Sequence, residues 1–257
     1  MNLTSDIRQR LQTKPILLMT HLVLGYPSLE VNRQVIRRMA ENGVDCIEMQ
    51  IPFSEPMADG PVILKANQDA LSKGIRVADC FSFAEKMTRE FPQVIFLFMT
   101  YYNIIFRYGE EAFIKRAAEI GIRGFIVPDL PPEEGQSYLK LSKQHGTVPI
   151  MFFTPTSTEE RMREVEKLGG GFIYCVARKG VTGKKTAIDD ALAQNLDRYR
   201  KATSLPLAVG FGISSREDVA LLEGKADIAV IGTATIRLVD KHGPDAVGPF
   251  IGTLLGR

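Results

Sequence analysis

The stretch IEMQIPFSEPMADGP, residues 47–61, is an apolar run with one acidic side chain that passes into a loop rich in Pro and Gly. The apolar run is typical of a buried strand. Side chains alternate between the two faces of a strand, so Glu48 and Gln50 share one face and the apolar residues around them share the other. A buried carboxylate is costly unless it is paired or protonated. Glu48 therefore either has a polar partner in the protein interior or has a chemical role.

Similar short apolar runs recur along the whole chain and alternate with segments of helical periodicity. Several of these segments open on Ser or Thr and close on Gly, which are capping residues. Most runs are apolar at nearly every position, as in parallel strands covered on both faces. Eight βα units in about 250 residues predict a (β/α)8 TIM barrel. The predicted strands are residues 16–24, 46–51, 94–100, 124–127, 148–153, 172–176, 205–209 and 228–231.

The alternative architecture is a doubly wound open sheet. Such a sheet more often has about five to seven strands and a Gly-rich turn after the first one. No linker, low-complexity tract or block of charge divides the chain. We therefore expect a single TIM-barrel domain over residues 1–257, with an N-terminal helix before the first strand.

The composition is that of an ordinary soluble globular chain, because 45% of the 257 residues are hydrophobic and 24% are charged. The formal net charge of +2 comes from interspersed signs, without the basic face that nucleic-acid binding requires. No long apolar segment indicates a membrane span or secretion, so we expect a cytoplasmic protein. Cys46, Cys80 and Cys175 lack metal-ligand spacing, so we expect three buried thiols and no metal site.

The predicted barrel gives the opening stretch a functional interpretation. Glu48 would point inward near the carboxyl-terminal end of the second strand, where TIM barrels carry their active sites. The loop that follows could bring Asp59 over the same opening. Two carboxyl groups in different environments are typical of a general acid/base site. A plain surface Asp-Gly turn is the alternative for Asp59.

Two glycine turns follow the seventh and eighth predicted strands. They lie in LAVGFGISS, residues 207–215, and in VIGTAT, residues 230–235. The first lacks the third glycine of a dinucleotide-binding motif, because Ser215 stands there. Backbone amides of paired turns at these two strands, with a helix opening after Gly232, predict a phosphate site. Two ordinary tight turns are the alternative.

A third stretch, ARKGVTGKKT at residues 177–186, follows the sixth predicted strand. It does not fit the phosphate-loop motif, because Arg178 stands where that motif requires Gly. Its glycines and Thr182 suit a lid over the catalytic end of the barrel, and a solvated loop is equally compatible with the composition.

Several of these motifs, in this order, resemble the family of tryptophan synthase α subunits over essentially the whole chain. Residues 47–61 are similar to the family pattern E-x-G-I-P-F-S-D-P-x-A-D-G-P. GVTG at 180–183, GFGIS at 210–214 and Gly-Thr at 232–233 also match, and PDLPPEE at 128–134 is a weaker match.

The resemblance implies a carbon-carbon lyase of tryptophan biosynthesis. Such an enzyme cleaves indole-3-glycerol phosphate into indole and glyceraldehyde 3-phosphate without a cofactor or metal. The resemblance also implies a partner β subunit in an αββα assembly, with pyridoxal phosphate bound only by that partner.

By resemblance, Glu48 corresponds to the catalytic acid/base and Asp59 to the carboxylate that receives the indole N–H. Thr182 corresponds to a lid residue, while Tyr174 and Phe211 correspond to residues that contact the indole ring. The positions that match the family's phosphate-binding backbone are Gly183, Gly212, Gly232 and Thr233.

Four positions depart from the family pattern. Gln50 replaces a Gly, and it could bond Glu48 or crowd the substrate. His21 and Tyr26 stand where the family more often has an apolar or aromatic residue and Asp, and His21 could be a core residue or a donor near the ring. Glu55 replaces an Asp in a loop that contacts the partner subunit.

Two other functions remain possible from the sequence. A regulatory subunit that only activates its β partner is one, although the presence of both carboxylates argues against it. Another phosphosugar barrel is the second, although no Lys at a strand end supports Schiff-base aldol chemistry.

Overall fold

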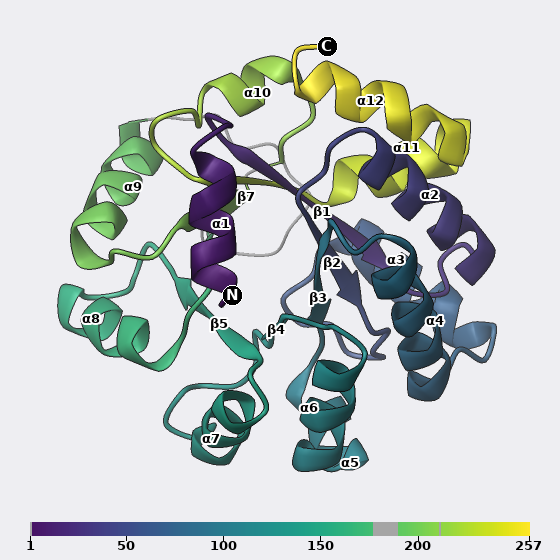
Figure 1. The fold of residues 1–257 in the computed structure, drawn as a ribbon, viewed down its shortest axis with the longest axis horizontal. Helices are drawn as coiled ribbons and strands as arrows, with labels where there is room; N and C mark the ends of the chain where they lie inside the picture. The colour runs from purple at the N-terminus through teal and green to yellow at the C-terminus, as the bar shows by residue number, and fades with distance from the viewer. Residues whose placement is uncertain (1, 177–189, 211) are drawn as a thin grey trace.

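The structure, a computed structural model, describes residues 2–176, 190–210 and 212–257, and it contains a closed barrel of parallel strands (Figure 1). Each strand pairs with the next one along the chain, and β8 pairs with β1. This order confirms the predicted TIM barrel. The strands are β1 (Leu17–Val23), β2 (Cys46–Gln50), β3 (Ile95–Met99), β4 (Gly124–Ile126), β5 (Val148–Phe153), β6 (Ile173–Val176), β7 (Leu207–Gly210) and β8 (Ile228–Ile231).

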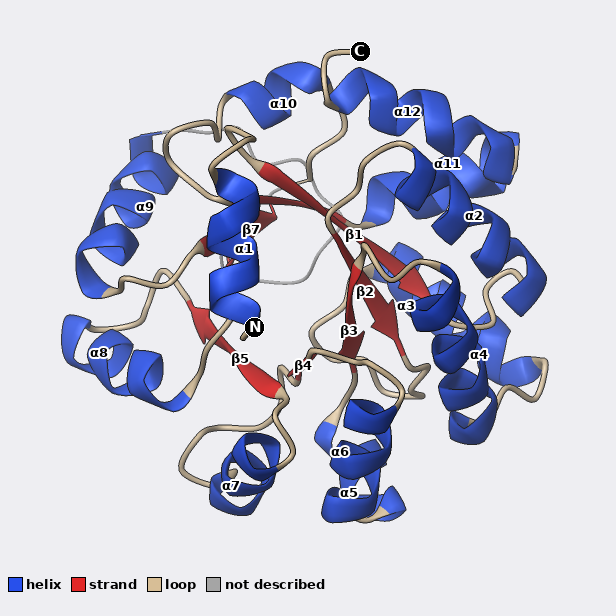
Figure 2. Ribbon diagram, in the orientation of Figure 1, coloured by secondary structure: helices blue, strands red, loops and turns tan. Residues whose placement is uncertain are grey.

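Helices form an outer ring around the barrel, as Figure 2 shows. Between the strands they bury the apolar outer face of the sheet, as expected for βα units. In the described part of the chain they are α1 (Leu3–Leu11), α2 (Leu29–Glu41), α3 (Pro61–Ser72), α4 (Val77–Glu90), α5 (Tyr102–Tyr108), α6 (Glu110–Glu119), α7 (Gln136–Gln144), α8 (Glu159–Leu168), α9 (Asp190–Ala202), α10 (Arg216–Ala220), α11 (Thr233–His242), the 3-10 helix η1 (Pro244–Ala246) and α12 (Val247–Leu254).

The predicted caps explain where several helices begin. Ser28 precedes α2, and its side chain accepts a hydrogen bond from the backbone N–H three residues later. Thr158 does the same for α8, and Ser215 does so for α10. Each side chain satisfies one of the N–H groups that the first turn of a helix leaves without a partner. These three starts were therefore predictable from local sequence.

The strand predictions are confirmed, with differences of one or two residues at the ends. The largest difference is at β7, which begins at Leu207 instead of Leu205. The N–H of Leu205 bonds the side chain of Thr203, and Pro206 has no N–H to donate to a neighbouring strand. The apolar pattern extends past these residues, but the backbone pairing does not.

Alternate residues of the strands belong to two separate cores. Leu17 and Met19 lie in the cluster inside the barrel, whereas Leu18 packs in the larger cluster against the helices. In β2, Ile47 and Met49 belong to the outer cluster. Glu48 and Gln50 therefore face the barrel interior, as predicted. The three cysteines are free and buried, which was also predicted.

Helix α1 closes the amino-terminal end of the barrel and lies across the front of it in Figure 1. Leu3 and Ile7 are buried in the inner cluster together with Leu17. The hydroxyl of Thr4 accepts a hydrogen bond from the backbone N–H of Gly171 at 2.9 Å. The N-terminal helix that we predicted is thus a plug, and the opposite end of the barrel stays open. No helix in the described ranges is both long and apolar enough to cross a membrane.

Candidate active site

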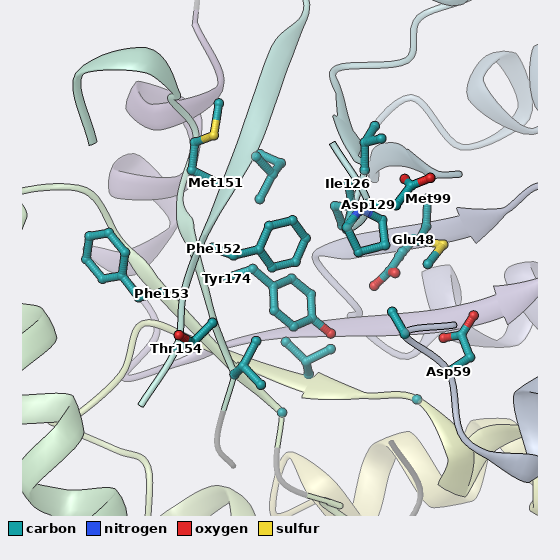
Figure 3. A pocket seen from close by; sticks show the side chains of 18 of the residues that line it. Glu48, Asp59, Met99, Ile126, Asp129, Met151, Phe152, Phe153, Thr154 and Tyr174 are labelled. Atoms are coloured by element: carbon teal, nitrogen blue, oxygen red, sulfur yellow. The ribbon is translucent and has the colours of Figure 1, made fainter. Parts of the chain in front are cut away.

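A cavity of about 750 Å³ lies at the carboxyl-terminal end of the barrel. Side chains from several strands and from the loops after them line it (Figure 3). This is the end at which the sequence predicted the site. The predicted site residues that line the cavity are Glu48, Asp59, Tyr174, Gly212, Gly232 and Thr233.

Glu48 projects from β2 into this cavity and is only 4% exposed. Its Oε2 atom is buried and has no hydrogen-bond partner among the described residues. Burial, and then the nearby charge of Asp59, raises the pKa of Glu48 to about 8. At neutral pH this carboxyl group is therefore mostly protonated, so it can act as an acid.

Asp59 stands in the loop between β2 and α3, and its carboxylate is held by two donors. Gln50 Nε2 donates to Asp59 Oδ2 at 2.7 Å, and the hydroxyl of Tyr101 donates to the same oxygen at 3.0 Å. Burial raises the pKa of Asp59 to about 6, while the two hydrogen bonds oppose this rise. Asp59 is consequently mostly ionised at neutral pH, whereas Glu48 is mostly protonated.

Tyr101 is a site residue that the sequence analysis missed. Besides donating to Asp59, its hydroxyl accepts a hydrogen bond from the backbone N–H of Ala58 at 3.1 Å. Its ring stacks on Phe53 with the ring centroids 5.1 Å apart. Tyr101 thus fixes the loop that carries Asp59. A sequence signal was present, because Tyr101 directly follows the third predicted strand, at the catalytic end of the barrel.

One wall of the cavity is aromatic. Tyr174 on β6 packs beside Phe152 on β5, with the ring centroids 5.6 Å apart and the planes inclined by 39°. Figure 3 shows the Tyr174 hydroxyl pointing toward the side of the cavity that carries Glu48 and Asp59. Burial, with the charges of these two carboxyl groups, raises the pKa of Tyr174 well above its ordinary value. The hydroxyl stays protonated, and the wall offers a flat apolar surface with one polar edge.

The glycine turn after β8 leads directly into helix α11. Gly232 is the N-cap of this helix and Thr233 is its first residue. The N–H groups of a first helical turn have no partner inside the helix and favour an anion. Among the described residues, a Cβ atom built on Gly232 would have only the Cβ of His21 near it, at 4.0 Å, so these residues leave the space beside this glycine open.

The turn after β7 is only partly available to a ligand. Gly212 adopts a φ of 88°, which favours glycine, and it lines the cavity. The backbone N–H groups of Ser214 and Ser215 both donate to Asp218 Oδ2, at 2.9 and 3.0 Å. The protein itself therefore uses these two amides. An anion would be held mainly at the start of α11 and at Gly212.

The departures from the family pattern also have defined positions. Gln50 bonds Asp59 and His21, instead of bonding Glu48 as we considered. His21 is buried and lines the cavity. The hydroxyl of Tyr26 donates to Asp240 at 2.9 Å, and Glu55 is exposed. Only the first two of these departures therefore belong to the site.

Three predicted site residues, Thr182, Gly183 and Phe211, lie outside the described residues, and so does the predicted lid. Their roles stay predictions. Among the residues that the structure does describe, no group of three or more His, Cys, Asp and Glu side chains could hold a metal ion.

Comparison with known sequences identifies the family. The sequence matches the family described as "Tryptophan synthase alpha chain" over residues 3–247. The tryptophan synthase alpha chain of Desulfotalea psychrophila is 60% identical over 254 residues, which cover 99% of this chain and 100% of the relative. The corresponding chain of Syntrophotalea carbinolica is 56% identical over 252 residues, which cover 98% of this chain and 99% of the relative.

Solved structures agree with the sequence comparison. A tryptophan synthase structure from Mycobacterium tuberculosis matches with a TM-score of 0.92 and 31% identity, covering 99% of this chain and 96% of that chain. A structure from Aquifex aeolicus VF5 matches with a TM-score of 0.91 and 34% identity, covering 100% and 98%. The fold, and the lyase function in tryptophan biosynthesis, are as the motifs predicted. The chain belongs to the tryptophan synthase alpha chain family.

Proposed function

We propose that the cavity cleaves indole-3-glycerol phosphate into indole and glyceraldehyde 3-phosphate, with Glu48 as the acid and base and Asp59 as the acceptor of the indole N–H. The observation that carries this assignment is the difference between the two carboxyl groups. Glu48 has a pKa of about 8 and holds a proton, while Asp59 has a pKa of about 6 and is ionised. The first can donate a proton, and the second can stabilise a positive charge.

The first step is protonation of the indole ring. Glu48 donates its proton to C3 of the ring, and the positive charge that forms lies on the ring nitrogen. The Asp59 carboxylate accepts a hydrogen bond from that N–H, which is stronger in the charged intermediate than in the substrate. Glu48 is buried and Asp59 is partly buried, which strengthens this interaction because less water competes for it.

The second step breaks the carbon-carbon bond. Glu48, now a carboxylate, removes the proton from the C3′ hydroxyl of the glycerol chain. The bond between C3 and C3′ then breaks, its electron pair returns to the ring, and the C3′ oxygen becomes the aldehyde oxygen of the second product. Glu48 ends the cycle protonated, as it began. The buried Oε2 atom of Glu48 supports this double role, because no described residue forms a hydrogen bond with it and it can therefore exchange a proton with the substrate.

The phosphate group of the substrate would lie at the start of α11. Backbone N–H groups of Gly232 and Thr233, together with the turn at Gly212, would hold it. These glycines line the same cavity as the two carboxyl groups. One molecule with an indole ring and a phosphate end can therefore contact both parts of the site. Thr182, Gly183 and Phe211 would complete the contacts in the way the family pattern implies.

A tryptophan synthase β subunit is the partner that we propose, in an αββα assembly with pyridoxal phosphate in the β subunit. Two large apolar side chains, Met57 and Phe106, are 76% and 69% exposed. They follow β2 and β3, so both lie in segments at the open end of the barrel. These two side chains are the contacts that we propose for that subunit. The cytoplasmic location that we expect for this assembly also stays a prediction.

Replacing Glu48 by Gln tests the catalytic assignment. The amide cannot donate or accept the proton that the two steps require, so indole release should fall by about 10² or more. The variant Glu119→Gln, on the exposed surface of α6, is the matched control and should keep its activity.

The same assay should be run with and without a β subunit. Indole formation by the isolated chain, lost in Glu48→Gln, supports the lyase assignment. An unchanged rate in Glu48→Gln would contradict it, and activity seen only as stimulation of the β subunit would favour a regulatory role.

A further inference from the structure

Two buried side chains connect strand β1 to the Asp59 carboxylate through a chain of hydrogen bonds. His21 Nε2 lies 2.8 Å from Gln50 Oε1, and Gln50 Nε2 donates to Asp59 Oδ2 at 2.7 Å. His21 is 4% exposed and Gln50 is fully buried. Both face the barrel interior from adjacent strands, and both stand at positions where the sequence departs from the family pattern.

The charge of Asp59 determines which group donates each of these two hydrogen bonds. An ionised Asp59 can only accept, so the Gln50 amide nitrogen must donate to it. The Gln50 oxygen then points at His21 and can only accept. His21 must therefore carry its proton on Nε2. The tautomer of the histidine is thus set by the charge of Asp59, two hydrogen bonds away.

The other nitrogen of His21 agrees with this tautomer. Nδ1 is buried and has no hydrogen-bond partner in the described part of the chain. A buried acceptor without a partner is tolerated better than a buried N–H without one. Burial also lowers the pKa of His21 to about 4, so the ring is neutral near pH 7. A neutral ring with its proton on Nε2 satisfies every one of these observations.

The two hydrogen bonds to Asp59 reach the same oxygen. Gln50 and Tyr101 both donate to Oδ2, and Oδ1 accepts no hydrogen bond from the described residues. A carboxylate that is held through one oxygen presents the other in a fixed direction. Gln50 is itself oriented by His21, because its amide could otherwise rotate and turn its oxygen toward the carboxylate.

We propose that His21 and Gln50 are positioning residues, which act through Asp59 by directing its Oδ1 atom toward the N–H of the substrate ring. This inference rests on the proposed role of Asp59. Gln50 supplies the directing hydrogen bond, and His21 keeps the Gln50 amide in the orientation that can supply it. Neither residue exchanges a proton with the substrate.

The direct test is the tautomer of His21, measured by ¹⁵N NMR of the intact protein with uniformly labelled histidine. The chain has three histidines, so comparison with His21→Phe assigns the signal. The expected result is a neutral ring protonated on Nε2 between about pH 6.5 and 7.5, where Asp59, with a pKa of about 6, is mostly ionised and His21, with a pKa of about 4, is neutral. A ring protonated on Nδ1, or a charged ring, would overturn the proposal. This readout does not depend on activity, so it separates failure of the proposal from failure of the assigned function.

The kinetic test uses the near-isosteric variant Gln50→Met, which removes the amide but keeps the length of the side chain. With indole-3-glycerol phosphate as substrate, kcat should fall about tenfold, as expected for loss of one hydrogen bond to a charged group, while KM changes less. The acidic limb of the pH profile should also move to higher pH, because Asp59 loses a donor that lowers its pKa. An unchanged limb would contradict a role through Asp59. Among the described residues, Glu48 on β2, Tyr101 after β3 and Tyr174 on β6 have pKa values that respond to the charge of Asp59, and all three are retained in this variant.

Four further variants test whether His21 acts through Gln50, and Gln50 through Asp59. His21→Phe should lower kcat about threefold, and His21→Gln, which keeps an N–H donor, should restore most of it. The double variant of His21→Phe and Gln50→Met should be no slower than Gln50→Met alone. In an Asp59→Asn background, Gln50→Met should add no further loss. If the rate losses of the single changes multiply in either double variant, the two residues act independently and the proposed series of hydrogen bonds is refuted. Urea midpoints for each variant establish that the compared proteins are folded.

Discussion

Two buried carboxyl groups, one just before strand β2 and one in the middle of it, have opposite surroundings. Asp45, just before the strand, receives Lys14 Nζ at 2.5 Å and the backbone N–H of Leu18 at 3.1 Å. Glu48, three residues later, has a buried oxygen with no partner among the described residues. Asp45 lies at the end of the barrel that α1 closes, and Glu48 lies at the open end. The carboxylate at the closed end is paired with opposite charges, whereas the one at the open end is buried without such a partner and is the proposed acid and base.

The same contrast extends to the neighbouring groups. At the closed end, Arg10 also approaches Asp45, at 3.7 Å, so the buried charge is compensated twice. At the open end, Asp59 and Glu48 have the same sign, and the charge of Asp59 adds to the effect of burial on Glu48. Like charges raise the pKa of a carboxyl group, and opposite charges lower it. The arrangement at the open end therefore favours keeping a proton on Glu48.

The variant Asp45→Asn should show the largest effect, and that effect should be on the stability of the protein. This change removes the counter-charge of Lys14 inside the closed end and should lower the free energy of unfolding by about 3 to 5 kcal/mol. Turnover of the folded enzyme should stay within about a factor of two, because the catalytic end is untouched. Urea denaturation and indole release measure the two quantities.

The control for that variant is Glu41→Gln, whose carboxylate is in an exposed ion pair with Arg38 at 3.6 Å. Its effect on stability should be below about 0.5 kcal/mol. A large loss of turnover in Asp45→Asn, with stability unchanged, would show that the two ends of the barrel do not have the separate roles described.

A smaller effect is expected from Asp59→Asn at the open end. The amide can still accept a hydrogen bond from the ring N–H but carries no charge, so kcat/KM should fall about 10- to 30-fold. Stability should not decrease, because burial disfavours the charge that is removed and the amide oxygen of Asn can still accept the hydrogen bonds from Gln50 and Tyr101. Steady-state kinetics with indole-3-glycerol phosphate checks the first expectation, and urea denaturation checks the second. Unaltered kinetics would remove Asp59 from the proposed mechanism.

The last test concerns the dependence of stability on pH. Glu48 has a folded-state pKa of about 8, above its ordinary value of 4.5. Between these values the folded protein binds more protons than the unfolded one, so this group lowers stability as pH rises from about 5 to 8. Glu48→Gln cannot titrate, so its stability should exceed that of the unchanged protein by a margin that grows by about 3 kcal/mol over this range. Melting temperatures at pH 5.5 and 8, the two ends of the range given by the pKa values, measure the margin. A margin that shrinks with rising pH would show that Glu48 is ionised in the folded state.

Local sequence determined the fold and much of the site. Strand periodicity, Ser and Thr caps and glycine turns are set by neighbouring residues, so the barrel and the inward direction of Glu48 were predictable. The position of Glu48 at the open end followed from the chain order of the strands. The residues outside the described ranges, Thr182, Gly183 and Phe211, were assigned only by their match to the family pattern.

Only the tertiary structure decided which polar groups are already paired. Tyr101 reaches Asp59 across 42 positions of sequence, and His21 reaches Gln50 across 29. Asp218 removes two amides from the turn that looked available to phosphate. Such pairings depend on how closing the barrel brings distant strand ends together, and alternation along one strand carries no information about them. The protonation of Glu48 likewise depends on burial and on a neighbouring charge, which exist only once the chain has folded.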